Sequence, residues 1–129
     1  MEVVPQSSKL SAPVVLLVDD LPEYRRVLAR VLRVDNGLEV LECGSGLAAL
    51  TILSSCPVDL VVADECMPQM SGSTLLHIIG QRWPRTRRLL VSAHTTGELV
   101  AGSPYRVIDK ALAGWLVTET IDDLARQKP

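Results

Sequence analysis

The stretch VVLLVDDLPE, residues 14–23, joins an apolar run to an acidic pair and a helix start. Its first part, Val14–Val18, is rich in β-branched residues and leucine, a composition typical of a strand buried on both faces of a parallel sheet. Asp19 and Asp20 follow as acidic cap residues, and Pro22 suits the first turn of a helix, where its missing N–H would have no partner anyway. The stretch therefore predicts a strand that leads through two carboxylates into a helix.

The same strand-and-helix unit recurs along the chain. After a first helix that stops at Asn36-Gly37, we expect strands at Leu38–Leu41, Val58–Ala63, Arg88–Val91 and Tyr105–Ile108, helices at Ser45–Ser54, Ser73–Arg82 and 113–127, and at most a short helix in 93–104. Strands that alternate with helices favour right-handed crossovers and a parallel sheet covered on both faces. The predicted fold class is a doubly wound α/β domain with a five-stranded parallel sheet in the order 2-1-3-4-5.

The composition fits one small globular domain. The chain has 129 residues, of which 47% are apolar and 22% charged, and its formal net charge is −2. A nucleic-acid-binding protein would carry a basic surplus, and a membrane span would need an apolar run of about 18 residues; the sequence has neither. We therefore expect no nucleic-acid or membrane partner. The predicted domain organisation is a flexible leader at 1–12 and one folded domain at 13–129.

The cysteines indicate the compartment. Cys43, Cys56 and Cys66 are odd in number and form no C-x-x-C pair. This pattern argues against a disulfide framework or a zinc site and is typical of a reducing environment. The predicted location is the cytoplasm.

Polar side chains gather at the predicted carboxyl ends of the strands. Strand one leads into Asp19 and Asp20, strand three into Asp64, strand four into Ser92, and strand five into the segment that holds Lys110. In the order 2-1-3-4-5, strands one and three are neighbours, so the three carboxylates converge. Their mutual repulsion would be relieved by a hard cation such as Mg²⁺. With a lysine and a hydroxyl beside them, the carboxylates predict phosphoryl transfer to an aspartate.

The stretch DLVVADECMPQMSG, residues 59–72, makes this prediction more specific. Together with Val18-Asp19-Asp20, Ser92-Ala93 and Lys110, in the same order and spacing, it resembles the receiver domains of two-component response regulators. The resemblance covers about residues 14–126 and implies a flavodoxin-like fold. It also implies a phosphoprotein of a signal-transduction phosphorelay, whose partner is a sensor histidine kinase or a phosphotransfer protein.

The resemblance assigns a role to each site residue. Asp64 would accept the phosphoryl group and help to bind Mg²⁺, and Asp20 would be a further metal ligand, with Asp19 bound directly or through water. Cys66 would lend its backbone carbonyl to the metal. Lys110 would pair with Asp64 and then with the phosphoryl group, which the Ser92 hydroxyl would also bind. Such a domain is not an enzyme in the metabolic sense, because it catalyses only its own phosphorylation and dephosphorylation.

Three departures from the family pattern fall near the last strand and helix, the face through which a homodimer or an output partner would dock. Ala111 follows the lysine where receivers usually have a cis proline, so we expect a trans peptide there. Val107 occupies the place of the family's aromatic switch residue. The segment between Ser92 and Lys110 is several residues short, which predicts a shortened fourth helix. These departures motivate a different interpretation, a phosphorylation-independent receiver-like interaction module.

Other interpretations of single residues compete with this one. Asp20 would serve equally as a helix cap, and Ser92 and Lys110 as an ordinary loop hydroxyl and a surface lysine. The segment Gly44–Ala49, GSGLAA, fits the dinucleotide-binding pattern G-x-G-x-x-A. That fingerprint normally follows the first strand of a sheet, whereas here a complete strand and helix precede it. Small residues that open the second helix are the simpler explanation.

Overall fold

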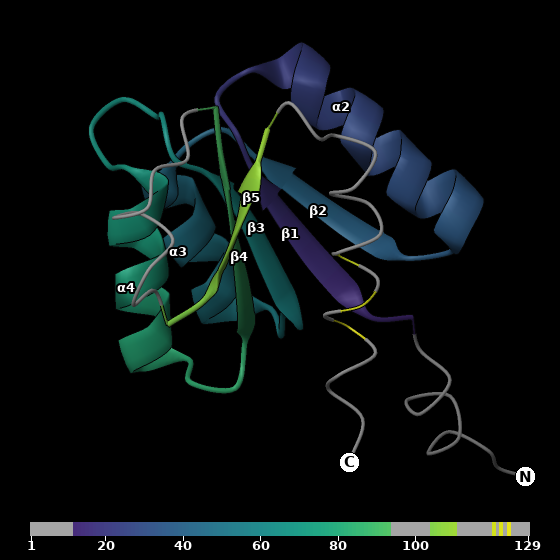
Figure 1. Ribbon diagram of the computed structural model, residues 1–129. Coiled ribbons are helices and arrows are strands. Elements are labelled where there is room, and N and C mark those ends of the chain that lie inside the picture. The colour runs from purple at the N-terminus through teal and green to yellow at the C-terminus, as the bar shows by residue number, and fades with distance from the viewer. Residues whose placement is uncertain (1–11, 94–103, 111–119, 121, 123, 125–129) are drawn as a thin grey trace, which may run out of the picture.

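The computed structural model describes residues 12–93, 104–110, 120, 122 and 124. Its centre is a sheet of five strands in the order β2-β1-β3-β4-β5, in which every neighbouring pair is parallel (Figure 1). The predicted fold class and strand order are therefore confirmed. The strands are β1 (Val14–Val18), β2 (Glu39–Cys43), β3 (Leu60–Asp64), β4 (Arg87–Ser92) and β5 (Arg106–Asp109).

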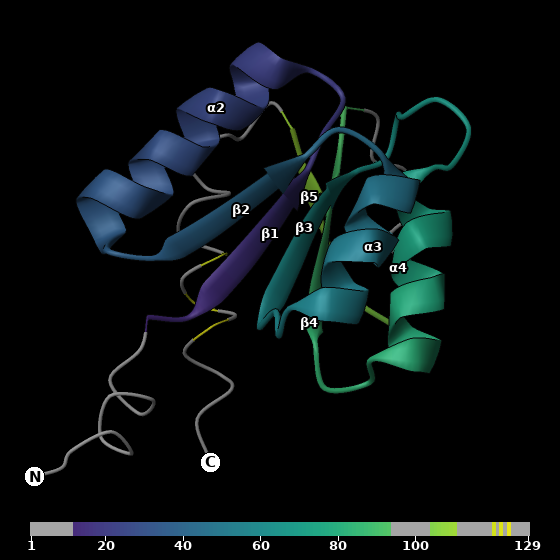
Figure 2. The same cartoon turned by 180° about the vertical axis from the view of Figure 1, so that it is seen from behind.

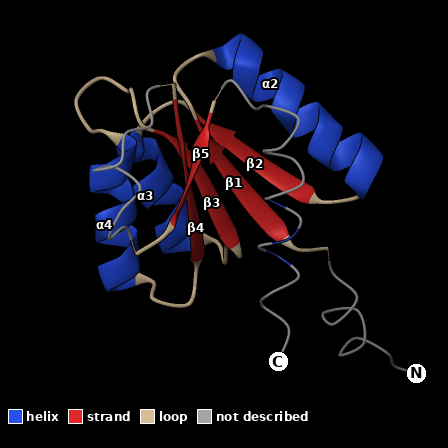
Figure 3. Ribbon diagram, in the orientation of Figure 1, coloured by secondary structure: helices blue, strands red, loops and turns tan. Residues whose placement is uncertain are grey.

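Helices cover both faces of the sheet. Helix α2 (Pro22–Arg30) continues into the π-helical segment η1 (Val31–Asp35) and lies on one face, while α3 (Gly46–Ser55) and α4 (Gly72–Arg82) lie on the other (Figures 1 and 2). The alternation of helix and strand is visible in Figure 3. This is the doubly wound arrangement that the alternating sequence pattern predicted.

Strands β2, β3 and β5 begin later than the apolar pattern suggested, and β5 starts at Arg106 rather than at Tyr105. Strand β2 starts at Glu39 because the Leu38 N–H still bonds back to the carbonyl of Leu32 (3.2 Å) at the end of the preceding helix. Strand β3 starts at Leu60, and Asp59 joins the start of β1: its carboxylate accepts the Val14 N–H (2.8 Å), and its own N–H donates to the Val14 carbonyl (2.9 Å). Hydrogen bonds to more distant residues thus join Leu38 to the preceding helix and Asp59 to β1.

The core consists of two layers, one on each side of the sheet. Alternate strand residues point to opposite faces, so Val15 and Leu17 pack toward α2, while Leu16 and Val18 pack toward α3 and α4. Strand β3 is buried along its whole length and forms the centre of the molecule. This explains why its sequence shows a continuous apolar run rather than an alternation.

Some expectations concern residues outside the described part of the chain. They include the leader through residue 11, residues 94–103 of the segment 93–104 in which a short helix was expected, and the trans peptide between Lys110 and Ala111. Of the predicted last helix, residues 120, 122 and 124 are helical, and Thr120 and Leu124 are buried. Among the helices that the structure describes, none has the length and apolar character needed to cross a bilayer.

Candidate functional site

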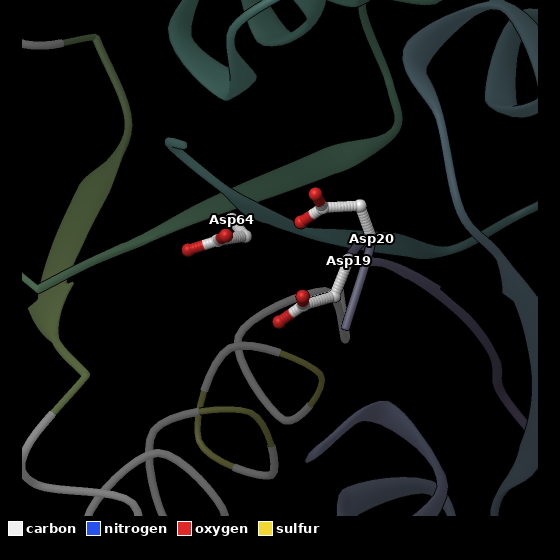
Figure 4. Close-up of side chains that lie close together, drawn as sticks. All are labelled: Asp19, Asp20 and Asp64. Carbon is white, nitrogen blue, oxygen red and sulfur yellow. The ribbon is translucent and has the colours of Figure 1, made fainter. Parts of the chain in front are cut away.

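Three carboxylates lie together at the carboxyl edge of the sheet. Asp19 and Asp20 follow β1, Asp64 ends β3, and the two strands are neighbours in register, with Val18 opposite Ala63. One oxygen from each of the three side chains lies within 4.8 Å of the other two (Figure 4). Asp19 and Asp64 are buried, and Asp20 is half-buried. The convergence expected from the strand order is therefore present.

The backbone around Asp19 holds this acidic cluster in place. The Asp19 N–H donates to the carbonyl of Cys43 (3.1 Å), and its carboxylate accepts the Leu21 N–H at 2.9 Å. The Arg25 guanidinium donates to the Asp19 carbonyl at 2.6 Å. The expectation of an acidic helix cap is wrong, because Leu21 occupies the cap position of α2 and makes no side-chain capping bond. Asp20 is thereby left to contribute its carboxylate to the cluster.

Strand β5 brings a cation to the same edge. The Lys110 ammonium lies 3.2 Å from an Asp19 oxygen and 3.5 Å from an Asp64 oxygen. Its backbone N–H donates to the Ser92 carbonyl at 2.7 Å, which ties the residue to β4. The Lys110 side chain is 17% exposed, so this ion-paired lysine is not an ordinary surface residue.

Burial and the neighbouring charges shift the pKa values of Asp64 and Lys110. Burial, followed by the nearby Asp19 charge, raises the pKa of Asp64, and Lys110 offsets this only in part. For Lys110, burial alone would lower the pKa, but the carboxylates of Asp19 and Asp64 outweigh it and raise the pKa. In the described part of the chain, Lys110 thus pairs with two of the three clustered carboxylates, and their negative charge is only partly compensated.

The donor set suits a hard divalent cation. Carboxylate oxygens are the ligands that Mg²⁺ prefers, and it typically uses one or two of them while keeping several waters. The three aspartates offer one oxygen each within a small volume that is only partly open to solvent. The residues present therefore fit a magnesium ion.

The two remaining predicted site residues also lie at this edge. Ser92 ends β4, is buried, and lies opposite Asp109 in the register with β5. Cys66 follows Asp64 by two residues in the loop after β3, and its side chain is exposed. The phosphoryl-binding role of Ser92 and the metal-binding role of the Cys66 carbonyl stay predictions.

Close packing explains why the M-P-Q-M-S-G segment ends in a glycine. A Cβ atom at Gly72 would overlap the backbone carbonyl of Asp64, so only glycine lets α4 start this close to the end of β3. The Gly72 N–H donates to the Glu65 carbonyl (3.1 Å), and the Glu65 carboxylate accepts the Ser73 N–H (2.8 Å). The motif thus builds a tight loop that anchors the carboxyl end of β3.

The dinucleotide-like pattern has a packing explanation. Ser45 caps α3 by accepting the Ala48 N–H at 3.1 Å. Gly46 lies against Met70, and a Cβ atom there would overlap the methionine sulfur. The small residues therefore let the second helix approach the loop that follows Asp64, and the pattern needs no nucleotide to explain it.

Sequence reasoning missed two residues of the site, Tyr24 and Arg25. Both lie on the first turns of α2, four and five residues after Asp20. Arg25 supports the Asp19 backbone and pairs with Glu42, and the Tyr24 ring lies beside the Lys110 ammonium. The available signal was their spacing, because one helical turn after the acidic pair returns the chain to the site.

Fold and site together define a doubly wound α/β domain with an acidic, lysine-paired centre at the carboxyl edge of its sheet. The family model described as the response regulator receiver domain matches residues 15–103. The chain belongs to this family, and its membership confirms the resemblance noted in the sequence. Receiver domains of this family are signalling switches of two-component response regulators rather than metabolic enzymes.

Individual relatives agree with this placement. The chain is 31% identical over 110 residues to the hydrogenase transcriptional regulatory protein HoxA of Cupriavidus necator, covering 84% of this chain and 22% of that protein. The signal receiver domain of an HD domain-containing protein from Pseudomonas fluorescens has a TM-score of 0.81 at 30% identity, covering 90% of this chain and 97% of that one. The response regulator TrrA of Thermotoga maritima, solved with Mg²⁺ and BeF, has a TM-score of 0.77 at 25% identity, covering 87% and 98%. The chain spans about a fifth of the length of the first curated relatives that it matches.

Proposed function

We propose that this receiver domain accepts its phosphoryl group on Asp64. The observation that carries the proposal is the placement of Asp64, buried at the end of β3, between two further carboxylates and the ammonium of Lys110. A carboxylate in this position is a nucleophile, with a lysine beside it to meet the charge of an incoming phosphoryl group.

The proposed reaction moves one phosphoryl group. An Asp64 carboxylate oxygen attacks the phosphorus of a phosphohistidine, the P–N bond breaks, and an acyl phosphate forms on Asp64. Lys110, whose ammonium lies 3.5 Å from an Asp64 oxygen, then pairs with a phosphoryl oxygen, and the Ser92 hydroxyl donates to another. Attack by water on the phosphorus later breaks the P–O bond to Asp64, which releases inorganic phosphate and restores the carboxylate. These self-phosphorylation and self-dephosphorylation steps are the only catalysis that we assign to the domain.

We propose that the acidic cluster binds Mg²⁺, which Asp19, Asp20, Asp64 and the backbone carbonyl of Cys66 would hold. When bound, it supplies positive charge that offsets the carboxylates and the phosphoryl oxygens. The all-oxygen donor set supports this assignment, as does the similarity to TrrA, which was solved with Mg²⁺ and BeF. Among the described residues, the Lys110 ammonium pairs with Asp19 and Asp64, and the ion would add the positive charge that the third carboxylate needs.

The proposal extends to the setting of the domain. The phosphoryl donor is a sensor histidine kinase or a phosphotransfer protein, and the folded unit spans residues 13–129, with a flexible leader at 1–12. The domain works in the cytoplasm, which its three free cysteines support. A homodimer or an output partner docks on the face near β5 and the last helix.

The test is the intact mass of the protein after incubation with acetyl phosphate and Mg²⁺. We expect one phosphoryl adduct that disappears when EDTA removes the ion and is absent from Asp64→Asn. The matched control is Asp122→Asn, because Asp122 is an exposed aspartate outside the cluster, and this variant should be phosphorylated like the wild type. An adduct that persists in Asp64→Asn would refute the assignment. No adduct on a protein that binds Mg²⁺ would instead favour the phosphorylation-independent module.

A further inference from the structure

An aromatic ring forms part of the wall around the lysine of the site. The Lys110 ammonium lies 4.4 Å from the centroid of the Tyr24 ring, within the range of a cation–π contact. Tyr24 is on the first turn of α2 and packs against the core layer on that face of the sheet. The ring is therefore held by the core of the domain and not only by its contact with Lys110.

The ammonium has partners from three parts of the chain. It lies 3.2 Å from Asp19, 3.5 Å from Asp64 and 4.4 Å from the ring centroid of Tyr24. Phosphorylation would convert the Asp64 carboxylate into an acyl phosphate, so that partner changes during the proposed reaction. The ring keeps its charge distribution throughout, and it is a constant attraction for the cation before and after transfer.

The ring of Tyr24, rather than its hydroxyl, is the part that acts on the site. The hydroxyl oxygen is buried and, in the described part of the chain, has no hydrogen-bond partner. Burial raises the pKa of this phenol, against the opposing effect of Lys110, so the side chain is neutral at physiological pH. A buried hydroxyl without a partner contributes no favourable bond, and phenylalanine should therefore replace tyrosine without loss.

We propose that Tyr24 is a positioning residue that holds the Lys110 ammonium against Asp64 for phosphorylation. This role rests on the function proposed above. Replacing Tyr24 by leucine keeps an apolar side chain on the core but removes the π face. The energy of a cation–π contact corresponds to a fall of about two- to thirtyfold in the rate of phosphorylation.

The experiment measures the initial rate of phosphorylation by acetyl phosphate and Mg²⁺ from intact mass. We expect wild-type rates for Tyr24→Phe and the two- to thirtyfold loss for Tyr24→Leu. The matched control is Tyr105→Leu, because the Tyr105 ring also lies over a cation, the Arg88 guanidinium, at 5.5 Å. Tyr105 precedes the amino end of β5, whereas Lys110 follows its carboxyl end. Urea unfolding of each variant verifies the fold, and Tyr24→Met replaces Tyr24→Leu if that variant does not fold.

Two further measurements separate positioning from a structural effect. The first repeats Tyr24→Leu in a Lys110→Met background, where the substitution should no longer change the rate because its target is gone. The second records the NMR shifts of the Lys110 side-chain methylene protons, which the ring current should displace in the wild type and Tyr24→Phe but not in Tyr24→Leu.

The outcomes distinguish this inference from the proposed function. A wild type that gains no adduct would refute both. A wild type that is phosphorylated, with Tyr24→Leu equally fast, would refute only the positioning role. Equal losses for Tyr24→Leu with and without Lys110 would also overturn it, because the effect would then not pass through the lysine.

Discussion

The ammonium of Lys110 should be a main stabiliser of the metal-free domain. It lies 3.2 Å from Asp19 and 3.5 Å from Asp64, and all three side chains are largely buried. Lys110→Met removes the charge while keeping an apolar side chain of similar length. The variant leaves the acidic cluster with no compensating cation among its described contacts.

The distances between Lys110 and the two carboxylates set the expected loss of stability. With an effective dielectric constant of about 20, each lysine–carboxylate pair is worth about 5 kcal/mol before the cost of burying the ammonium is subtracted. Without the lysine, two carboxylates within 4.8 Å repel each other by about 3.5 kcal/mol. This agrees with the loss of about 3–5 kcal/mol usual when one partner of a buried pair is removed. We expect Lys110→Met to lower the free energy of unfolding by about 3–4 kcal/mol.

The assay is urea unfolding at pH 7.5 in EDTA, followed by tryptophan fluorescence. The matched control is Arg33→Met, which removes a cation that is 46% exposed, pairs with Glu42 (3.1 Å) and donates to the Val40 carbonyl (2.6 Å). The ion pair of this more exposed cation is worth less than about 1 kcal/mol. Added Mg²⁺ should recover more stability in Lys110→Met than in the wild type, because the ion supplies the missing charge. The loss of stability in Lys110→Met should also shrink at acidic pH, where Asp64, whose pKa is raised, becomes protonated.

The electrostatic reasoning would be refuted by a small effect. If Lys110→Met and Arg33→Met lose the same stability in EDTA, the ammonium does not offset the repulsion within the acidic cluster. A deficit that stays constant from neutral to acidic pH would show that the loss comes from packing and not from charge.

Three other predictions concern the surroundings of the cluster. Because the pKa of Asp64 is raised in the folded state, its contribution to stability is complete below about pH 4 and is lost as the pH rises through the folded pKa. The free energy of unfolding of Asp64→Asn, measured relative to that of the wild type in EDTA, should therefore increase from acidic to neutral pH. A difference that stays constant with pH would contradict this. Gly72→Ala should destabilise the domain by about 1–3 kcal/mol in urea unfolding, since the new methyl group overlaps the Asp64 carbonyl, and wild-type stability would show that the loop is not tightly packed. Arg25→Met should lower the free energy of unfolding by about 1.5–3 kcal/mol because it removes charged hydrogen bonds to the Asp19 carbonyl and to Glu42. Calorimetric titration of this variant should also show weaker Mg²⁺ binding. An unchanged Mg²⁺ affinity would mean that Arg25 does not support the acidic cluster.

Much of the fold was predictable from local pattern. The continuous apolar runs of β1 and β3 have no polar face, so these strands require helices on both sides. The stop at Gly37, whose φ is +67°, and the serine caps of α3 and α4 are short-range chemistry that sequence displays directly. The boundaries at Leu38 and Asp59 were missed because one long-range and one medium-range hydrogen bond decide them.

In the candidate site, too, local features were predictable from the sequence and long-range contacts were not. The sequence alone determined that Asp19, Asp20, Asp64 and Lys110 lie at the carboxyl ends of their strands, because a residue's place on a strand is a local property. Only the tertiary structure decided which of these groups touch, that Asp20 is not a helix cap, and that the Tyr24 ring lies beside the Lys110 ammonium. Such contacts depend on strand order, register and helix packing, which join residues as far apart as Asp19 and Lys110.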